Sequence, residues 1–312
     1  MKTAIYLFLI ISLNITPQKR ICFTFDDFPH VYIQLYNDNF MKNSMQKFID
    51  TLLVYRVPAI AFINEIKLYN NYGFENAKIV ELVRMWIDAG FEIGNHTYSH
   101  KNLNLYPAGS FKTDIFLGEK ITNRILKEKN KKMTYFRFPQ LETGKTAQEF
   151  KEIKEFLRKH GYETAPVTMK NEDFYFAAAY SKANKQKDPA QMKLIAQDYL
   201  SYLPKFIDYF EKQSEFLFKR QINQIMLLHV NELNIDYINE VCKVFINKGY
   251  QFITMEKALS DPVYAIEETY YGSAGIPFLE SKAIKTGIFY NPHKLKLFRG
   301  THIELPKYLK KP

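Results

Sequence analysis

The sequence predicts an α/β fold in which helical crossovers close a parallel sheet into a barrel. Short apolar runs, typical of strands buried on both faces, alternate along the chain with longer stretches of helical periodicity. Five or more such units follow one another, which favours a barrel over an open sheet. The first strand is followed by TFDDFPH rather than by a G-x-G-x-x-G loop, which weighs against a dinucleotide-binding fold.

In the first half of the chain, each predicted strand is a compact apolar run. Helices are predicted from apolar residues at helical spacing, with Asn37 or Asp38 as the N-cap of the first and Gly90 as the stop of the second. The predicted order is strand Ile21–Phe25, helix Asn39–Tyr55, strand Pro58–Ile63, helix Asn76–Ala89, strand Phe91–Ile93, helix Phe111–Lys129 and strand Thr134–Phe138.

The second half continues the alternation, with one interruption. It is predicted to run through helix Lys145–His160, a strand near Thr164–Thr168, strand Gln224–His229, helix Ile235–Asn247 and strand Tyr250–Thr254. Asp188–Arg220 interrupts the repeat as a long amphipathic stretch, predicted to pack as a helical pair or cap on the barrel. The glycine- and proline-bearing tail, residues 261–312, is predicted to be an extended wrapping segment with at most one short helix.

The N-terminus has the pattern of a secretory signal. Lys2 supplies a positive charge, and Ala4–Ile15 is almost wholly apolar but too short to span a bilayer comfortably. Residues 1–18 are therefore predicted to be a signal peptide, and the protein to be secreted or periplasmic without stable membrane insertion after cleavage. An uncleaved anchor and a buried first strand are the alternatives. The barrel is assigned to residues 19–260, with the helical insertion at 188–220.

Composition bounds the class of protein. With 312 residues, 46% of them apolar, the chain can bury a large core. The net charge of +10 suggests attraction to anionic surfaces, but no compact basic and aromatic patch supports nucleic-acid binding. Only two cysteines are present, Cys22 and Cys242, which excludes a disulfide framework and a zinc ribbon. We expect both thiols to be buried, with a single disulfide as the alternative.

Titratable side chains stand at the ends of four predicted strands. Asp26 and Asp27 follow the first, His96 and His100 the third, Arg137 ends the fourth, and His229 ends the strand QIMLLH. In a parallel barrel the active site is built at the C-terminal strand ends, so these side chains are expected to meet. Each has a structural explanation by itself: a turn, a core histidine or a surface ion pair. Their joint occurrence at equivalent strand ends favours a functional site.

The chemistry of these side chains suits a metal-assisted hydrolase. On a helical turn, the spacing of His96 and His100 would bring both imidazoles within reach of one ion. Two histidines and one carboxylate leave positions open on a divalent metal, which would lower the pKa of bound water and polarise a carbonyl. A second carboxylate and a further histidine would then serve as general base and general acid.

Five motifs, in order, resemble those of the polysaccharide deacetylases, the NodB-homology domain of carbohydrate esterase family four. They cover roughly residues 20–260 and read FTFDDFP, GNHTYSHKNL, FRFP at Phe136–Pro139, NEDF at Asn171–Phe174 and IMLLH at Ile225–His229. The resemblance implies a distorted (β/α) barrel of about seven parallel strands, with a helical insertion and an extended C-terminal tail. It also implies removal of N-acetyl or O-acetyl groups from a carbohydrate by water that the metal activates.

The resemblance implies roles for single residues. The ligands of one divalent metal ion, usually zinc, would be Asp27, His96 and His100. Asp26 would be the general base, oriented by Arg137, and His229 the general acid, oriented by Asp173. The backbone N–H of Gln140 would help to hold the tetrahedral oxyanion. Leu227 would line the pocket for the acetyl methyl group, and Phe174 would contact the sugar.

The motifs also depart from the family pattern. Phe28–Pro29 stands in place of Gly-Pro, Gln140 in place of an aromatic residue, and Phe174 in place of a tryptophan. In the family, residues at these positions contact the sugar substrate, so the departures bear on the identity of the substrate more than on the reaction. The expected partner is an N-acetylated glycan or a small acetylated sugar. The alternatives are hydrolysis of a non-sugar amide or cyclic imide at the same site, and a catalytically inactive glycan-binding protein.

Overall fold

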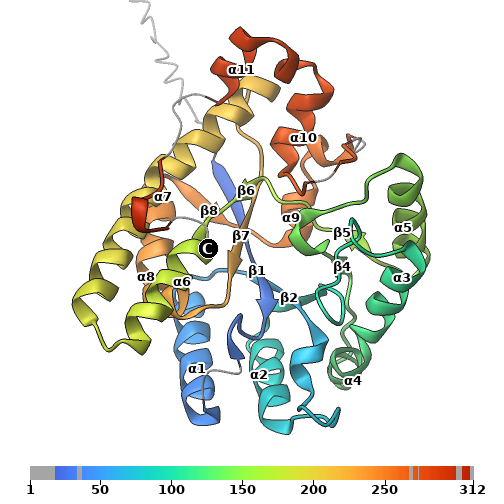
Figure 1. Cartoon of the computed structure of the whole chain (residues 1–312), viewed down its shortest axis with the longest axis vertical. Helices are drawn as coiled ribbons and strands as arrows, with labels where there is room; N and C mark the ends of the chain where they lie inside the picture. The colour runs from blue at the N-terminus through green and yellow to red at the C-terminus, as the bar shows by residue number, and fades with distance from the viewer. Residues whose placement is uncertain (1–17, 34–36, 267–269, 273, 300–303, 310–312) are drawn as a thin grey trace, which may run out of the picture.

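A parallel sheet of eight strands forms the centre of the molecule (Figure 1). The computed structural model describes residues 18–33, 37–266, 270–272, 274–299 and 304–309. Seven strands follow in the order β5-β4-β3-β2-β1-β7-β6, and the eighth pairs with the start of β1. They are β1 (Lys19–Phe28), β2 (Ile60–Ile63), β3 (Glu92–Asn95), β4 (Tyr135–Phe136), β5 (Glu163–Thr164), β6 (Met169–Lys170), β7 (Gln224–His229) and β8 (Tyr250–Phe252).

The sheet curves into a half-barrel, which confirms the predicted distorted barrel of about seven parallel strands. Every strand pair is parallel. The two ends of the strand order, β5 and β6, are separated by only four residues in the sequence. The barrel is therefore open between these two strands, and the C-terminal segment reaches this opening, where Phe278 N–H donates to the carbonyl oxygen of Val167 at 2.7 Å.

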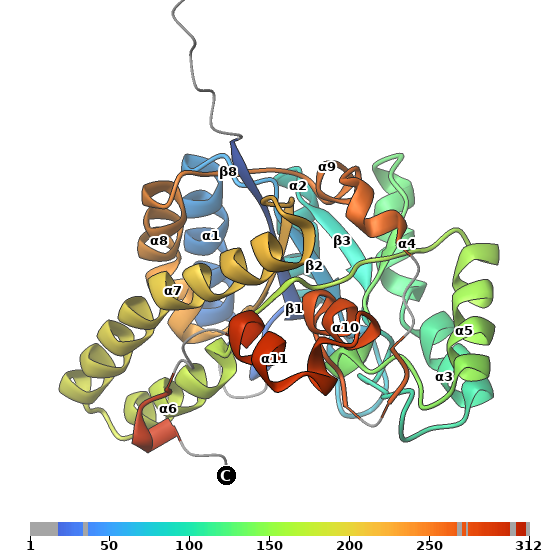
Figure 2. The same ribbon diagram turned by 90° about the horizontal axis from the view of Figure 1, so that it is seen from above.

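Helices surround the sheet on the outside (Figures 1 and 2). Asn37 is the N-cap of the first, because its side chain accepts a hydrogen bond from the Phe40 N–H. The helices are α1 (Asp38–Val54), α2 (Ala77–Asp88), α3 (Ala108–Leu117), α4 (Lys120–Glu128), α5 (Ala147–Lys159), α6 (Asp173–Lys185), α7 (Pro189–Phe218), α8 (Glu232–Asn247), α9 (Met255–Leu259), α10 (Phe278–Lys285) and α11 (Pro292–Arg299).

The core is centred on β1, whose apolar residues are inaccessible to solvent on both faces. The ring of Phe25 packs edge to face on Phe48 of α1, at 5.1 Å, and on Trp86 of α2, at 6.0 Å. Phe23 packs in the same way on Phe245 of α8, at 5.0 Å. Burying one such ring contributes about 1.5–3 kcal/mol, so this aromatic layer fixes β1 and the two aspartates at its end.

The predicted helix Phe111–Lys129 is wrong as a single element, because Gly118 separates α3 from α4. A Cβ atom at Gly118 would lie 2.7 Å from the backbone carbonyl carbon of Thr97 and from the nitrogen of Tyr98. Only glycine allows the chain to approach this closely. The break therefore lets the loop that carries the two predicted histidine ligands pack against the helices.

The insertion is a single helix of 30 residues, α7, which packs against α6 and α8. The prediction of at most one short helix in the tail is wrong, since α10 and α11 both form there. Apolar side chains explain them: Phe298 of α11 packs with Phe216 and Leu217 of α7. Figure 2 shows α10 and α11 beside this long helix.

Two predictions concern the cysteines and the N-terminus. Cys22 and Cys242 are free and buried, as predicted. The predicted signal peptide lies, except for Gln18, outside the described residues. Among the described helices, none is long and apolar enough to cross a membrane.

Candidate active site

The three predicted metal ligands lie together at the C-terminal end of the sheet. One ligand atom from each of Asp27, His96 and His100 lies within 4.8 Å of the others. The Nε2 atom of His100 is 3.6 Å from Oδ1 of Asp27, and the two imidazole rings have centroids 5.0 Å apart. This spacing and this set of donors suit one divalent cation with coordination positions left for water and substrate.

The loop that carries both histidines is not a helical turn, which is what their spacing in the sequence suggested. Thr97 and His100 have positive φ angles, 65° and 57°, and no helix forms between His96 and Lys101. Side chains hold the loop instead: Asn64 donates to the His96 carbonyl at 2.7 Å, and the Thr97 N–H donates to Asn95 at 2.7 Å. The imidazoles therefore converge through polar contacts with the loop backbone.

The orientation of the His96 ring fixes which nitrogen faces the cluster. Its Nδ1 atom lies 2.8 Å from the carbonyl oxygen of Arg137, which can only accept a hydrogen bond. The proton therefore sits on Nδ1, and Nε2 keeps its lone pair, 3.8 Å from Oδ2 of Asp26. Burial lowers the pKa of His96 to about 4, against the opposite effect of Asp26. A neutral imidazole with a free Nε2 is the form that binds a metal.

Asp26 and Arg137 form a buried ion pair. The guanidinium Nη1 donates to Oδ1 of Asp26 and to Oγ1 of Thr24, both at 3.0 Å, and Nε donates to the Ala165 carbonyl at 2.8 Å. The guanidinium also lies over the ring of Phe62, at 4.3 Å. Burial lowers the pKa of Arg137, whereas Asp26 raises it. This arrangement fixes one carboxylate oxygen of Asp26 and leaves Oδ2 toward the histidines.

Besides the histidines, Asp27 has a cationic neighbour that was not predicted, Lys67. The ammonium group of Lys67 donates to the backbone carbonyl of Asp27 at 2.6 Å. Burial opposes ionisation of Asp27, but Lys67 and the histidines of the site hold its pKa well below the usual range. The carboxylate is therefore ready to bind a cation without first losing a proton.

His229 and Asp173 form a second pair of titratable side chains. Strand pairing places His229 opposite Asp26, because these two residues are in register on neighbouring strands β1 and β7. Asp173, the first residue of α6, accepts hydrogen bonds from His229 Nδ1 at 2.9 Å and from His229 N–H at 2.8 Å. Burial lowers the pKa of His229, but Asp173 outweighs it and raises the pKa to about 9.

The raised pKa predicts how His229 titrates. We expect its ring to be protonated at pH 7 in metal-free protein, and to lose its proton near pH 9. In Asp173→Asn the carboxylate that raises the pKa most is lost while burial remains, so the pKa of His229 is expected to fall below about 9. NMR titration of the ring Cε1–H signal measures both values. An unchanged pKa in this variant would contradict the assignment.

The same shift predicts a dependence of stability on pH. The folded pKa of His229 lies above its unfolded value of 6.5, so the folded state binds the proton more tightly. This contribution to the free energy of unfolding is complete below pH 6.5 and is lost as pH rises through about 9. We expect Asp173→Asn to flatten this decline in denaturant melts at pH 6, 8 and 10. A decline that is as steep in the variant as in the wild type would contradict this origin.

A buried polar network extends from Asp173 to the inserted helix α7. Asn234 donates to Oδ2 of Asp173 at 2.6 Å and to the His229 carbonyl at 2.8 Å. The hydroxyl of Tyr199, on α7, donates to Oδ1 of Asn234 and accepts from Asn171, both at 3.0 Å. None of these side chains is accessible to solvent. The inserted helix therefore contributes a hydroxyl group that positions Asn234 against the pair of His229 and Asp173.

Tyr199→Phe tests this link. The change removes the donor to Asn234 and the acceptor for Asn171 while it keeps the ring, so two buried amide groups lose a partner. We expect the free energy of unfolding to fall by about 1–3 kcal/mol. Urea denaturation measures the change, and Tyr72→Phe is the matched control, because Tyr72 is 85% exposed. Equal stability of the two variants would contradict the network.

Of the predicted substrate-contacting residues, Phe174 lies beside His229. Phe174 is 38% exposed, and its ring centroid is 6.2 Å from that of His229. Leu227 is buried two residues before His229 on β7. Gln140 has a positive φ of 58°, and its side chain accepts from Asn102 at 2.6 Å. A Cβ atom at Gly275 would lie 1.8 Å from the Gln140 carbonyl oxygen, so the tail crosses directly over Gln140.

Sequence reasoning missed four residues of the site. Asn64 and Lys67 follow the C-terminal end of β2. The other residues were selected because they follow strand ends, and the same criterion would have found these two. Asn234 follows the end of β7 by five residues, so the same criterion would have found it. Tyr199 carries no such signal, since it lies within α7, far from any strand end.

Comparison with known proteins gives one match of sequence and several of structure. Residues 14–165 match the family model described as polysaccharide deacetylase. No curated protein sequence matches the chain.

Three solved structures illustrate the structural likeness. The polysaccharide deacetylase Bc1974 from Bacillus cereus has 18% identity and a TM-score of 0.49, over 76% of this chain and 92% of that one. The peptidoglycan deacetylase PdaC from Bacillus subtilis has 18% identity and a TM-score of 0.48, over 78% and 92%. BA3943 from Bacillus anthracis, a CE4 family pseudoenzyme, has 15% identity and a TM-score of 0.47, over 78% and 66%.

The family model covers the first three motifs, from FTFDDFP to FRFP. The predicted enzyme class, hydrolases that act on carbon–nitrogen bonds other than peptide bonds, is the class of this family. The match over residues 14–165 agrees with the resemblance of these motifs to the polysaccharide deacetylases.

Proposed function

We propose that the protein removes acetyl groups from an N-acetylated sugar with the help of one divalent metal ion. The observation that carries the proposal is the convergence of two catalytic pairs on one cluster of metal ligands. Asp26, which is paired with Arg137, and His229, which is paired with Asp173, stand side by side on the adjacent strands β1 and β7. The Nε2 atom of His96, in the cluster, lies 3.8 Å from Oδ2 of Asp26. Each side chain needed for amide hydrolysis is thus present in one place.

The ligand set Asp27, His96 and His100 fits a zinc-like ion, because it offers two neutral nitrogen donors and one ionised carboxylate. When bound there, the metal would supply Lewis-acid chemistry, polarising the acetyl carbonyl and lowering the pKa of water. Lys67 holds the backbone at Asp27, and the carbonyl oxygen of Arg137 accepts a hydrogen bond from the Nδ1–H group of His96. The protein therefore orients at least two of the three ligands through a second layer of contacts.

The two pairs present opposite groups to the reaction: a carboxylate held by a guanidinium in one, and an imidazole held by a carboxylate in the other. In the proposed reaction Asp26 takes a proton from water at Oδ2, the oxygen that Arg137 Nη1 does not bind. His229 holds a proton at neutral pH and donates it to the departing amine from Nε2, because Nδ1 is bound to Asp173. The N–H of Gln140 binds the oxyanion, and Leu227 packs on the acetyl methyl group.

Residues 1–18 are proposed to be a signal peptide that directs the enzyme to a secreted or periplasmic location, where glycan substrates occur. N-terminal sequencing of protein recovered from culture medium or periplasm tests this proposal. A mature protein that begins near Gln18 supports cleavage, whereas an intact Met1 overturns it.

Acetate release is the direct test of the activity. Purified protein is incubated with N-acetylglucosamine oligomers, peptidoglycan and acetylated xylan, each with and without a chelator. We expect acetate from at least one of these glycans, and none after chelation. Ring opening of a cyclic imide without any acetate release would favour the non-sugar amide alternative. Glycan binding without turnover, by protein that carries its metal, would favour an inactive binding protein.

A further inference from the structure

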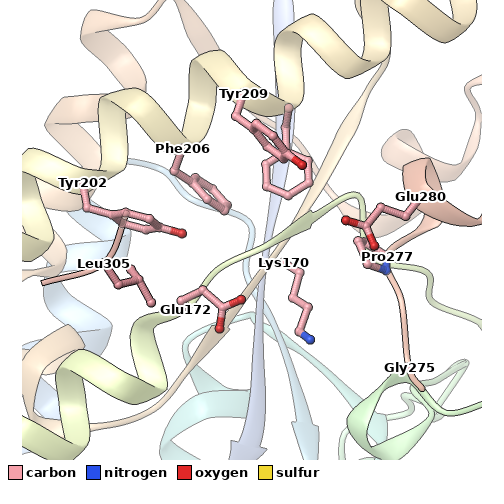
Figure 3. Close-up of a pocket in the computed structure, with 10 residues that line it drawn as sticks. Lys170, Glu172, Tyr202, Phe206, Tyr209, Gly275, Pro277, Glu280 and Leu305 are labelled. Atoms are coloured by element: carbon pink, nitrogen blue, oxygen red, sulfur yellow. The ribbon is translucent and has the colours of Figure 1, made fainter. Parts of the chain in front are cut away.

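A cavity lies between the inserted helix and the C-terminal segment, and none of the predicted metal ligands lines it. Its volume is about 400 Å³. Figure 3 shows side chains from three parts of the chain around it: α7 above, the segment that leads from β6 into α6 below, and the tail at the right. This volume is within the range of small-molecule sites in proteins.

One wall of the cavity is aromatic. Tyr202, Phe206, Tyr209 and Phe210 project from a single face of α7, at the i, i+4, i+7 and i+8 positions of the helix. Phe206 and Phe210 are buried, so they form a rigid floor, while Tyr209 remains partly accessible. The face of an aromatic ring is the negative side of its quadrupole, so it attracts the weakly positive C–H groups on the apolar face of a ligand.

The opposite wall is polar and mostly acidic. Lys170 and Glu172, on either side of Asn171, face the cavity together with Glu280 of α10. Burial raises the pKa of Glu280, while Lys170 and Arg299 lower it, but of these two cations only Lys170 lines the cavity. The two carboxylates and the ammonium group offer hydrogen-bond acceptors and a donor. The cavity is therefore suited to a ligand with an apolar face and several hydroxyl groups.

The cavity adjoins the proposed catalytic pair through the backbone. Glu172 directly precedes Asp173, whose carboxylate binds His229 at 2.9 Å. Lys170 is in register with Leu227 on the neighbouring strand, two residues before His229. The tail residue Gly275 contributes to the cavity and also contacts the Gln140 loop. Two of the three segments around the cavity, the one from β6 into α6 and the tail, thus also contact the strand and the loop that carry Leu227 and Gln140.

From this geometry we infer that the cavity binds one pyranose ring of an N-acetylated oligosaccharide, beside the sugar that is deacetylated. The inference rests on the proposed function for the identity of the oligosaccharide. The apolar face of the ring packs on Tyr209 and Phe206, and its hydroxyl groups donate to Glu172 and Glu280 and accept from Lys170. The inserted helix and the tail thereby select oligomers long enough to reach from the metal centre into the cavity.

Binding is measured by calorimetry in zinc-loaded Asp26→Asn protein, so that turnover does not interfere. The probe is the N-acetylglucosamine tetramer. We expect Glu280→Gln and Tyr209→Leu, each added to this background, to weaken tetramer binding about tenfold or more, because each removes a contact that the ring makes. Lys205→Ala, at an exposed position of the same helix, is the matched control and is expected to leave binding unchanged.

The outcomes separate this inference from the proposed function. Tetramer affinity that is equal in all three variants overturns the inference, even if the wild type releases acetate. Weakening by both cavity variants, with no acetate release by the wild type, sustains the sugar site and overturns the proposed activity. Binding of an aliphatic carboxylate such as decanoate, without binding of the tetramer, identifies the cavity as a lipid site and also overturns the inference. Circular dichroism melts confirm that each variant is folded.

Discussion

Asp26→Asn is expected to reduce acetate release by about 100- to 10,000-fold while the metal remains bound. The amide has nearly the same shape as the carboxylate, but it cannot take a proton from water. Asp26 is outside the cluster of metal ligands, so the variant should bind as much zinc as the wild type. The rate of acetate release and the zinc content of the purified protein measure the two effects separately.

The same variant should be less stable, because Asp26 is the buried counterion of Arg137. Removing one partner of a buried ion pair costs about 3–5 kcal/mol, although the amide oxygen can still accept one hydrogen bond and limit this loss. Asp88→Asn is the matched control, since its ion pair with Lys129 is exposed. Wild-type acetate release by folded Asp26→Asn protein would contradict the role of Asp26 as the base.

Removal of one imidazole from the metal cluster is expected to abolish activity and metal-dependent stabilisation together. His100 is 32% exposed at its side chain, so His100→Ala removes a ligand with little damage to the core. Zinc at about 100 times its dissociation constant should stabilise the wild type by about 2.7 kcal/mol. The variant should show no such stabilisation at the same zinc concentration, and its acetate release should fall to the background.

Thermal melts with and without zinc measure this stabilisation independently of turnover. His160→Ala is the matched control, since His160 is an exposed histidine at the end of α5, outside the cluster. It should respond to zinc as the wild type does. Equal stabilisation of His100→Ala and wild type would show that zinc binds elsewhere, and would contradict the assignment of the ligands.

The alternation of strands and helices was predictable because it depends on local periodicity. The residues of the metal cluster were predictable because parallel strands end at one edge of the sheet, so residues far apart in the sequence meet there. Asp26 and His229 illustrate this, since they are opposite each other in the register of β1 and β7. The family match over residues 14–165 agrees with the first three motifs.

Features that depend on tertiary contacts were not predictable from periodicity. The break at Gly118 arises from contact with the backbone at Thr97, which is distant in the sequence. Tyr199 has the pattern of an ordinary core residue of an amphipathic helix, and only the folded chain brings its hydroxyl to Asn234. The helices of the tail form because Phe298 finds an apolar partner in Phe216, in another part of the chain.

The positive φ angles of Asp27, His100 and Gln140 have a consequence for the evolution of this enzyme. For residues with a Cβ atom this backbone region is unfavourable, and glycine or asparagine occupies it more readily. Selection for heat resistance alone would therefore tend to replace these side chains. A glycine in place of His100 would relieve the backbone strain while it removes a predicted metal ligand, so a variant that loses activity there can gain tolerance to heat.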